Sequence, residues 1–473
     1  MTAPAHSATA IAADIAAGRR SAADIIEDAL ERLSTITRWN AVTRIYADRA
    51  RQRAAMIDAA RAAGRHPGPL AGVPFAAKDL YDVAGHITRA GSASTDANPP
   101  ADRDADAIAA MEAAGAILVA STTMDELAYG FAGDNARDGA ALNPRGLVLD
   151  GVERATGGSS SGSAALVGAG IVPIALGSDT NGSIRVPAAL CGVTGLKPTY
   201  GRLSRGGVFG FVTSLDHVGP LATTVADAAL AYDALQGPSD RDPVQARRRS
   251  QPVAENLAHA PIPRAKRLAG HFADPLDPDV ADALEAACSA LGADDSAELT
   301  LAAAARGAAF IITNAEGGAL HLPALIDRPE AFGALVRDRL RAGALLPAVW
   351  VARAHKLRRL MAGELARLMA ATDILLAPAT PCPAFTIGTE HQTVAGRELA
   401  LRLDIGLFTQ PLTMAGVPIA VVSATGARSG LPVGIQIIGR PFREDQVLAA
   451  ALALERQGFH IAPQMPPARH DRA

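Results

Sequence analysis

Three things are scarce in this sequence of 473 residues: cysteine, an excess of charge of one sign, and long apolar runs. Its three cysteines, Cys191, Cys288 and Cys382, lie far apart, are odd in number and lack metal-ligand spacing. This pattern fits a reduced cytoplasm better than a disulfide framework. The net charge of −3 leaves no broad basic surface for nucleic acid. We therefore expect no metal site and no nucleic-acid partner.

Signals for export and membrane insertion are also missing. Residues 1–20 lack the basic-then-apolar order of a signal peptide, and no run of 18 apolar residues offers a membrane span. With 49% hydrophobic residues the chain can bury a large core, and its length alone suggests two or three domains. We expect a cytoplasmic, globular protein that does not enter a membrane.

Hydrophobic periodicity and turn residues indicate a coarse order of elements. Ser21 and Asp24 resemble a helix capping box, and apolar residues follow at helical spacing. Residues 237–269 mix Pro, Arg and Asp irregularly and are predicted to be a connector. Helices are expected at 8–18, 21–36, 47–63, 104–114, 163–169, the end of 214–235, 277–291, 301–320, 329–341, 347–370 and 443–457, and extended segments at 70–83, 116–120, 171–176, 373–378, 415–423 and 431–438.

Residues 157–199 carry the most informative pattern. A Gly-Gly pair opens a serine-rich turn at 157–163, and a second tight turn at 178–183 follows a short apolar run. Ser159 and Ser183 are 24 residues apart, enough for a turn, a helix, a strand and another turn. This spacing brings the two hydroxyls to one end of a sheet, where α/β proteins place their sites. The N-terminal N–H groups of the intervening helix would point into that site.

Three interpretations of this stretch compete. A phosphate-binding loop would need the Lys-Ser/Thr ending of a P-loop, which is absent, and a flexible linker would not be followed at once by apolar runs. Nucleophilic catalysis by serine needs a base within hydrogen-bond reach. The nearest histidine, His217, sits beside Asp216 in a predicted turn outside the stretch. Lys78, in the apolar segment 70–83, is either a surface charge or a second candidate base, because burial would leave it a neutral amine.

Three blocks of the sequence stand at consistent spacing: GVPFAAKDLYDVAG (72–85), GGSSSGSAALVGAG (157–170) and GSDTNGSIRVPAALCGVTGLKPTYGRLS (177–204). Together they resemble the amidase signature family, and the resemblance extends from about residue 8 to residue 458. It implies an α/β fold of one domain, with a central mixed, mostly parallel twisted sheet covered by helices on both faces. We accordingly predict an N-terminal helical layer of this domain at 1–70, the amidase signature α/β domain at 71–460, and a flexible tail at 461–473.

The resemblance implies a Ser–cis-Ser–Lys catalytic group. Matched onto this chain, Ser183 is the nucleophile, Ser159 the bridging serine and Lys78 the base. Neutral Lys78 takes a proton from Ser159, which takes one from Ser183 as that hydroxyl attacks an amide carbonyl. Ammonia leaves first, and water then cleaves the acyl-enzyme. The implied peptide bond Gly158–Ser159 is cis. The implied oxyanion hole consists of the backbone N–H groups of Thr180, Asn181, Gly182 and Ser183.

Two charged residues of the third block have implied supporting roles. Asp179 is expected to orient the turn, and Arg185 to pin the loop after the nucleophile. Ser161 stands where the family commonly has glycine, which makes the loop less permissive but removes no catalytic group. The resemblance implies no metal and no cofactor.

Within the family, the chain looks closest to members that act on carboxylated biuret. Arg358 stands where family glutaminases hold the substrate carboxylate, and Gly406 stands where they hold the substrate ammonium with Asp. Such a site suits a small anionic substrate that is not an amino acid, for example a carboxylated biuret or another ureido acid. His217 and Tyr129 are further candidates for substrate contact. The alternative for Arg358 is a surface arginine on an Arg-rich helix.

Three functions follow from these observations. The first is an amidohydrolase that releases ammonia from a small anionic ureido-type substrate. The second is a relative with another substrate, either the glutaminase subunit of a tRNA-dependent amidotransferase or a general aliphatic or aryl amidase. The third is a non-catalytic interaction subunit, against which the intact Ser183, Ser159 and Lys78 argue. The resemblance also implies a homo- or hetero-oligomer with a small helical companion subunit.

Overall fold

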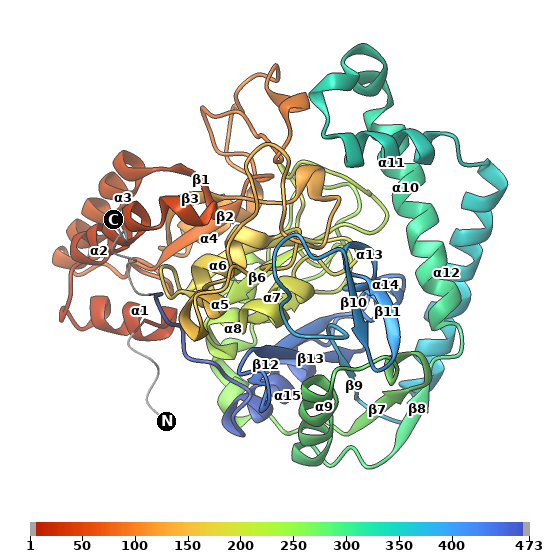
Figure 1. Ribbon diagram of the computed structural model, residues 1–473. Helices are drawn as coiled ribbons and strands as arrows, with labels where there is room; N and C mark the ends of the chain where they lie inside the picture. The colour runs from red at the N-terminus through yellow and green to blue at the C-terminus, as the bar shows by residue number, and fades with distance from the viewer. Residues whose placement is uncertain (1–5, 467–473) are drawn as a thin grey trace.

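An 11-stranded mixed sheet forms the centre of the computed structural model, which describes residues 6–466 (Figure 1). Its strands lie in the order β1-β3-β2-β4-β6-β5-β12-β13-β9-β7-β8, and β10 and β11 form a separate ribbon. In chain order the strands are β1 (Val42–Ile45), β2 (Pro74–Lys78), β3 (Ile117–Thr122), β4 (Ile174–Asp179), β5 (Thr194–Lys197), β6 (His217–Ala222), β7 (Ala265–Ala269), β8 (Ser296–Glu298), β9 (Ile374–Pro378), β10 (His391–Val394), β11 (Arg397–Ala400), β12 (Ile419–Thr425) and β13 (Pro432–Gly439).

The helices are distributed around this sheet. They are α1 (Ala8–Ala16), α2 (Ala22–Thr35), α3 (Ala47–Ala62), α4 (Asp106–Ala113), α5 (Pro144–Leu149), α6 (Ser161–Gly168), α7 (Arg185–Cys191), α8 (Val225–Leu235), α9 (Pro278–Ala290), α10 (Ala302–Asp327), α11 (Ala334–Ala344), α12 (Ala348–Leu368), α13 (Leu401–Asp404), α14 (Gln410–Thr413) and α15 (Glu444–Arg456). Along β13, Gly434 faces α7, whereas Gly439 faces α15. Because these two positions are an odd number of residues apart, they point to opposite faces, so helices cover both sides of the sheet.

The predicted α/β fold with a mixed sheet covered by helices is confirmed. Parallel pairs form two blocks, β3-β2-β4 toward one edge and β9-β7-β8 toward the other, so the predicted parallel pairing is found in these two blocks. The strands between the blocks pair antiparallel, as does β1 with β3. The connections explain the difference. A short turn at 426–431 joins β12 to β13, which only an antiparallel pair permits, whereas β2, β3 and β4 follow one another through helices.

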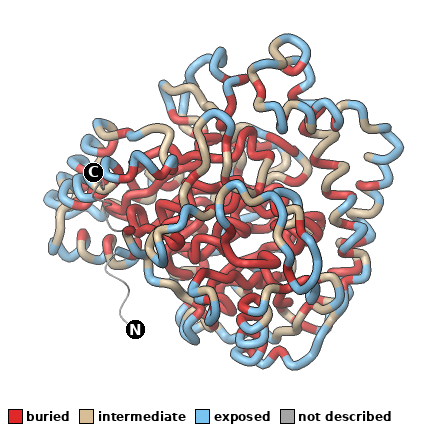
Figure 2. Tube along the Cα trace, viewed as in Figure 1, coloured by how far each residue is buried: buried red, intermediate tan, exposed pale blue. Residues whose placement is uncertain are grey.

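The hydrophobic core follows the sheet, and exposed backbone is concentrated at the periphery (Figure 2). The strands β2, β3, β4, β9 and β13 are buried along their whole length. Strands covered on both faces contain nearly continuous apolar runs, which explains why the sequence predicts most of them. The three cysteines are free thiols and buried.

Five strands of the main sheet, β1, β5, β6, β7 and β8, are not predicted from the sequence, and β6 and β7 show the reason. Residues 217–222 form β6 rather than the predicted turn, although Gly219 and Pro220 disfavour a strand. Pro220 lies opposite Leu176 of β4, at the centre of the sheet. Strand β7 lies inside the predicted connector 237–269 and pairs with β9, which is more than 100 residues later in the chain. Both strands depend on long-range pairing, which local sequence does not encode.

The ends of the chain belong to the same structure. Helices α1–α3 form the N-terminal layer, but β1 within this segment joins the main sheet through β3. Residues 461–466 have no regular structure, and Arg145 donates hydrogen bonds to the carbonyls of Ile461 and Ala462. The rest of the predicted flexible tail, 467–473, lies outside the described residues.

Helix α10 is longer than predicted and continues through Pro323 to Asp327. Within residues 6–466 it is the one helix whose length and mean hydropathy of 1.2 would allow it to cross a membrane. It packs against α11, α12 and α14, and Arg306 on it donates to the side chain of Gln410. The apolar composition of α10 is therefore that of a helix packed against other helices of the protein. Figure 1 shows α10–α12 at one side of the molecule, against the segment that carries α13 and α14.

Candidate active site

Lys78 and the two serines come from three neighbouring segments at one end of the sheet. Lys78 is the last residue of β2, Ser159 lies in the turn before α6, and Ser183 lies between β4 and α7. Because β2 and β4 are parallel neighbours, their carboxyl ends meet at the same edge. Lys78 Nζ donates to Ser159 Oγ at 2.6 Å and to Ser178 Oγ at 2.8 Å. The structure therefore brings together the predicted base and the predicted bridging serine.

The two serine turns lie against each other. The peptide bond Gly158–Ser159 is cis, as the resemblance implies. The backbone N–H of Ser160 donates to the carbonyl of Ser183 at 3.2 Å. In the described part of the chain the Ser183 hydroxyl has no hydrogen-bond partner, and the residue is 2% exposed. The hydroxyl is thus not committed to another protein group.

Burial governs the charge of Lys78. The side chain is fully buried, and this burial lowers its pKa from 10.5 to about 7, although the charges of Asp125, Asp179 and Asp216 favour the ammonium form. A lysine with a pKa of about 7 is largely neutral slightly above pH 7, so its amine can accept a proton. The site therefore contains a lysine with the protonation behaviour that a general base needs.

Asp125 lies on the other side of the bridging serine. Its backbone N–H donates to the carbonyl of Ser159 at 3.3 Å, and its carboxylate packs against the backbone of Gly130 and Gly158, where an added Cβ would lie within 2.2 Å of it. Burial raises the pKa of Asp125, and nearby Asp134 raises it further, while Lys78 opposes the shift. Within residues 6–466, Asp125 Oδ1 is buried without a partner. No local sequence pattern singles out this carboxylate.

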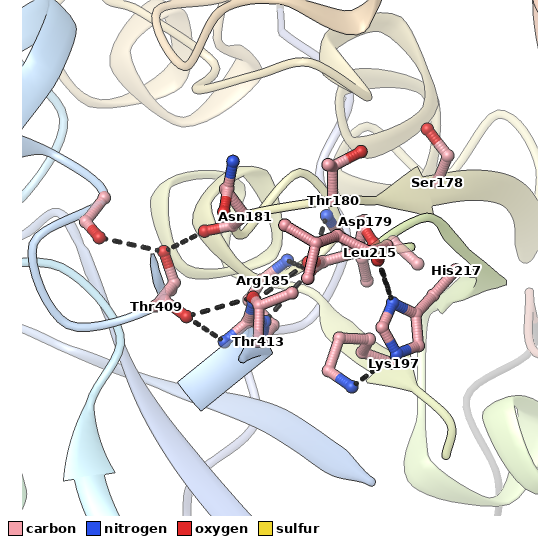
Figure 3. A network of polar contacts seen from close by, with 12 residues as sticks. Ser178, Asp179, Thr180, Asn181, Arg185, Lys197, Leu215, His217, Thr409 and Thr413 are labelled. Carbon is pink, nitrogen blue, oxygen red and sulfur yellow. Dashed lines mark hydrogen bonds and ion pairs between the residues drawn. The ribbon is translucent and has the colours of Figure 1, made fainter. Parts of the chain in front are cut away.

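Asp179 and Arg185 form a fully buried ion pair behind the nucleophile turn (Figure 3). Arg185 donates to both carboxylate oxygens of Asp179 at 2.9 Å, and also to the Thr409 carbonyl and the Gln436 and Thr413 side chains. Burial alone would raise the pKa of Asp179, but the charge and hydrogen bonds of Arg185 hold it at about 2. Asp179 also accepts the backbone N–H of Ile184. The pair ties the turn to α14 and β13, as a supporting role requires.

The nucleophile turn presents free backbone donors. Among the described residues, none accepts a hydrogen bond from the backbone N–H groups of 180–183. Gly182 has φ +140°, and a Cβ there would lie 2.2 Å from Thr409 Oγ1, so only glycine fits. Thr409 Oγ1 in turn donates to the Asn181 carbonyl at 2.7 Å. The turn is therefore held from outside while its N–H groups stay unpaired, which is the arrangement of an oxyanion hole.

Ser160 is the centre of a Gly-Ser-Ser-Ser-Gly run at 158–162, which has the spacing of a nucleophile elbow. Its hydroxyl donates to the Ser178 carbonyl at 3.2 Å and accepts the Ser178 N–H at 3.3 Å. Ser161, the departure from the family pattern, donates to the Thr123 carbonyl at 3.1 Å. Both hydroxyls are engaged with backbone, so they position the turn.

His217 lies in a strand rather than a turn, and it lines the cavity that Ser178 and Thr180 also line. It is the first residue of β6 and 4% exposed. Its Nδ1 contacts the Leu215 carbonyl at 2.6 Å, and its Nε2 contacts Lys197 Nζ at 3.2 Å (Figure 3). Burial and the charge of Lys197 lower its pKa well below the ordinary value. Both ring nitrogens contact protein groups, so the ring stabilises the packing behind the nucleophile turn, and substrate contact through His217 stays a prediction.

Two other predicted substrate residues, Tyr129 and Gly406, lie against aromatic rings. The Tyr129 ring packs between the Arg339 guanidinium, 3.6 Å from its centroid, and the ring of Phe211, and its hydroxyl donates to Asn314. A Cβ at Gly406 would lie 2.9 Å from the Phe131 ring, so that ring fills the space beside Gly406. The position is therefore apolar rather than acidic.

Arg358 lies on α12, half-buried, as the prediction of a helix before β9 requires. Its Nε donates to the Met414 carbonyl at 3.1 Å, and its guanidinium lies 5.7 Å from the centroid of the Tyr200 ring. In the described residues its two terminal nitrogens have no acceptor. The guanidinium is thus anchored at one atom and free at its fork.

Two cavities adjoin these residues. One, of about 130 Å³, is lined by Ser178 and Thr180 and by loop residues from 208 to 213. The other, of about 570 Å³, is lined by Asp125 and Tyr129 and by residues 333–336 at the start of α11. Helix α10 bonds one residue beside each cavity: Thr313 accepts from Asn181 of the nucleophile turn, and Asn314 accepts from Tyr129.

Known proteins of similar sequence identify the family of this chain. A family model described as Amidase matches residues 24–448, so the chain belongs to this family. The chain is 45% identical to the AtzE chain of 1-carboxybiuret hydrolase from Pseudomonas sp. (strain ADP), over 94% of this chain and 97% of that protein. It is 36% identical to one component of the Glutamyl-tRNA(Gln) amidotransferase of Symbiobacterium thermophilum, over 94% and 95% of the two chains.

Solved structures give the same result. A chain from a structure described as an unexpected vestigial protein complex that reveals the origins of an s-triazine catabolic enzyme superposes with a TM-score of 0.93 at 43% identity. The match covers 96% of this chain and 99% of that one. A bacterial aryl acylamidase of the amidase signature enzymes superposes with a TM-score of 0.84 at 26% identity, over 95% and 96% of the chains.

Proposed function

From its membership of the amidase signature family, which makes this chain an amidohydrolase, we propose that it cleaves the C–N bond of a small anionic ureido-type substrate and releases ammonia. The candidate substrates are a carboxylated biuret and related ureido acids. The contact of Lys78 Nζ with Ser159 Oγ, at 2.6 Å, is the observation that carries the reaction type. The 45% identity to a chain of 1-carboxybiuret hydrolase supports the substrate class.

The proposed reaction begins with a proton relay. Neutral Lys78 takes the proton of Ser159, and Ser159 takes the proton of Ser183 as Ser183 Oγ attacks the substrate carbonyl carbon. The reverse relay delivers a proton to the leaving nitrogen, so ammonia departs and an acyl group stays on Ser183. A water molecule, deprotonated by the same relay, then cleaves the acyl-enzyme. The relay is consistent with a lysine whose pKa burial lowers to about 7.

The charge on the carbonyl oxygen in this reaction needs fixed donors. The unpaired backbone N–H groups of 180–183 supply them in the proposal, and the Asp179–Arg185 ion pair keeps the turn in place. Removal of one such donor typically costs about 3–4 kcal/mol of barrier in amide-cleaving enzymes. No metal and no cofactor takes part in the proposed steps.

The proposed substrate preference rests on two positions. The free fork of Arg358 has the geometry to accept a carboxylate in two parallel hydrogen bonds. The Phe131 ring beside Gly406 offers no acidic partner for an ammonium group. A site with a carboxylate partner and without an ammonium partner favours a ureido acid over an α-amino acid amide such as glutamine.

The proposal also includes a cytoplasmic location and a small companion protein. The similar chain with TM-score 0.93 comes from a protein complex. Exposed large apolar side chains are concentrated on the α10–α12 arm, which offers surface for such a partner. They include Leu320, Ile326, Leu335, Leu345, Val349, Trp350 and Leu360.

The test compares ammonia release from carboxylated biuret, ureido acids, glutamine and simple amides. We expect the ureido acids to have the highest kcat/KM and Ser183→Ala to abolish both turnover and labelling by a fluorophosphonate probe. Arg358→Ala should raise KM for the carboxylated substrate about 10- to 100-fold, because a charged hydrogen-bond partner is lost. Arg359→Ala, on the same helix, is the matched control and should leave KM unchanged. Preferred turnover of glutamine, or an unchanged KM in Arg358→Ala, would contradict the proposed substrate.

A further inference from the structure

The two polar atoms of the Asn181 side chain have no part in the proposed reaction. It lies two residues before Ser183 in the nucleophile turn and is 7% exposed. Its side-chain Nδ2 donates to Thr313 Oγ1 on α10 at 2.8 Å, whereas its Oδ1 is buried and has no partner in residues 6–466. One half of the amide is therefore anchored and the other half is free.

A buried carbonyl oxygen without a partner is uncommon in folded proteins, because it loses its bonds to water and gains none. The backbone of Asn181 cannot move to relieve this, since its carbonyl accepts from Thr409 Oγ1 at 2.7 Å. Its side chain points away from the Arg185 network (Figure 3). The residue is fixed by Thr409 at its main chain and by Thr313 at its amide nitrogen, so the free oxygen has a defined position beside the nucleophile.

We propose that Asn181 Oδ1 accepts a hydrogen bond from the substrate N–H on the acyl side of the attacked carbonyl and so selects ureido compounds over amides. The inference rests on the proposed function. A ureido group has nitrogen on both sides of its carbonyl carbon, whereas a simple amide has carbon on the acyl side. Only the ureido group brings an N–H to this acceptor, and a simple amide leaves it unpaired.

Thr313 acts as a positioning residue in this arrangement. Its hydroxyl holds the amide nitrogen of Asn181, which orients the oxygen toward the substrate. Asn314, the next residue of α10, holds the Tyr129 hydroxyl. The same turn of α10 thus holds both Asn181 and Tyr129 by hydrogen bonds.

The experiment uses two acids of the same shape, hydantoic acid and succinamic acid, in which an N–H of the first is a CH₂ of the second. Both release ammonia and keep a carboxylate. We expect Asn181→Leu, which preserves volume but removes the acceptor, to lower the ratio of kcat/KM for hydantoate over succinamate about 10-fold or more. Thr313→Val should lower the ratio in the same direction by a smaller factor.

The exposed Asn98 provides the control, since Asn98→Ala should leave the ratio unchanged. A merely structural role of Asn181 would lower kcat/KM for both acids by the same factor, and that result would overturn the inference. If the wild-type protein hydrolyses neither acid, the pair is compared by calorimetric binding to Ser183→Ala, and the proposed function fails only if carboxylated biuret is not hydrolysed either. A ratio of dissociation constants that Asn181→Leu shifts then supports the role of Asn181, and an unshifted ratio overturns it.

Discussion

Two fully buried lysines, Lys78 and Lys197, make an instructive comparison. Burial lowers the pKa of each from 10.5 to about 7. Lys78 Nζ contacts two serine hydroxyls. Lys197 Nζ contacts the carbonyls of Val417 and Pro198 and a nitrogen of His217. A lowered pKa is therefore not sufficient for catalysis, and the partners decide which lysine can take a proton from a nucleophile.

The surroundings of the two lysines differ in the same way. In the described residues, the groups around Lys78 include atoms without partners, namely the Ser183 hydroxyl and Asp125 Oδ1. Around Lys197, by contrast, the amine itself bonds two carbonyls and contacts His217, and Asp179 and Arg185 nearby bond each other. Unpaired polar groups reduce stability, and a protein retains them where a substrate pairs with them. We call the surroundings of Lys78, which contain unpaired polar groups, the reactive layer. We call the surroundings of Lys197, where the polar groups bond one another, the supporting layer.

The largest expected effect separates the lysines by activity. Lys78→Met should lower kcat by about 10²–10⁴-fold, because the proton relay loses its base. Lys197→Met should retain most of kcat, since its amine contacts no group of the relay. Ammonia release under saturating substrate measures both. Equal losses in the two variants would contradict the distinction between them.

A smaller effect separates the lysines by stability. Lys197→Met should lower the free energy of unfolding by about 1–3 kcal/mol, because two buried carbonyls lose their donor. Lys78→Met should be neutral or stabilising. Urea unfolding at pH 7 measures this difference. A more severe loss in Lys78→Met than in Lys197→Met would show that Lys78 also supports the fold.

The same unfolding measurements test pH dependence. Each lysine holds fewer protons in the folded than in the unfolded state between about pH 7 and its ordinary pKa of 10.5. Stability contributed through these groups therefore rises with pH across this window and is lowest below it. Either substitution to methionine should reduce that slope, and an unchanged slope would contradict the buried, neutral state of the amine.

The sequence predicts the reactive layer better than the supporting one. Lys78, Ser159 and Ser183 stand in contiguous blocks. The parallel pairing of β2 with β4 places Lys78 in contact with Ser159, and the turn of Ser183 lies against the turn of Ser159. The position of His217 could not be predicted, because β6 forms only through pairing with β4 and β5. Asp125 escapes notice for a similar reason. Its burial results from the close approach of Gly130 and Gly158, which no local pattern signals.

The smallest expected effect concerns Asp125, because its charge acts on the pKa of Lys78. Asp125 favours the ammonium form of Lys78, so its removal should lower the pKa of that lysine further. In Asp125→Asn the acid limb of the kcat/KM profile should therefore move to lower pH, by roughly 0.5–1 unit. Asp134 lies near Asp125 and forms an ion pair with Arg402. Asp134→Asn is therefore the matched control, and it should shift the acid limb less. A limb that moves to higher pH, or does not move, would mean that Lys78 titrates independently of the carboxylate beside the bridging serine.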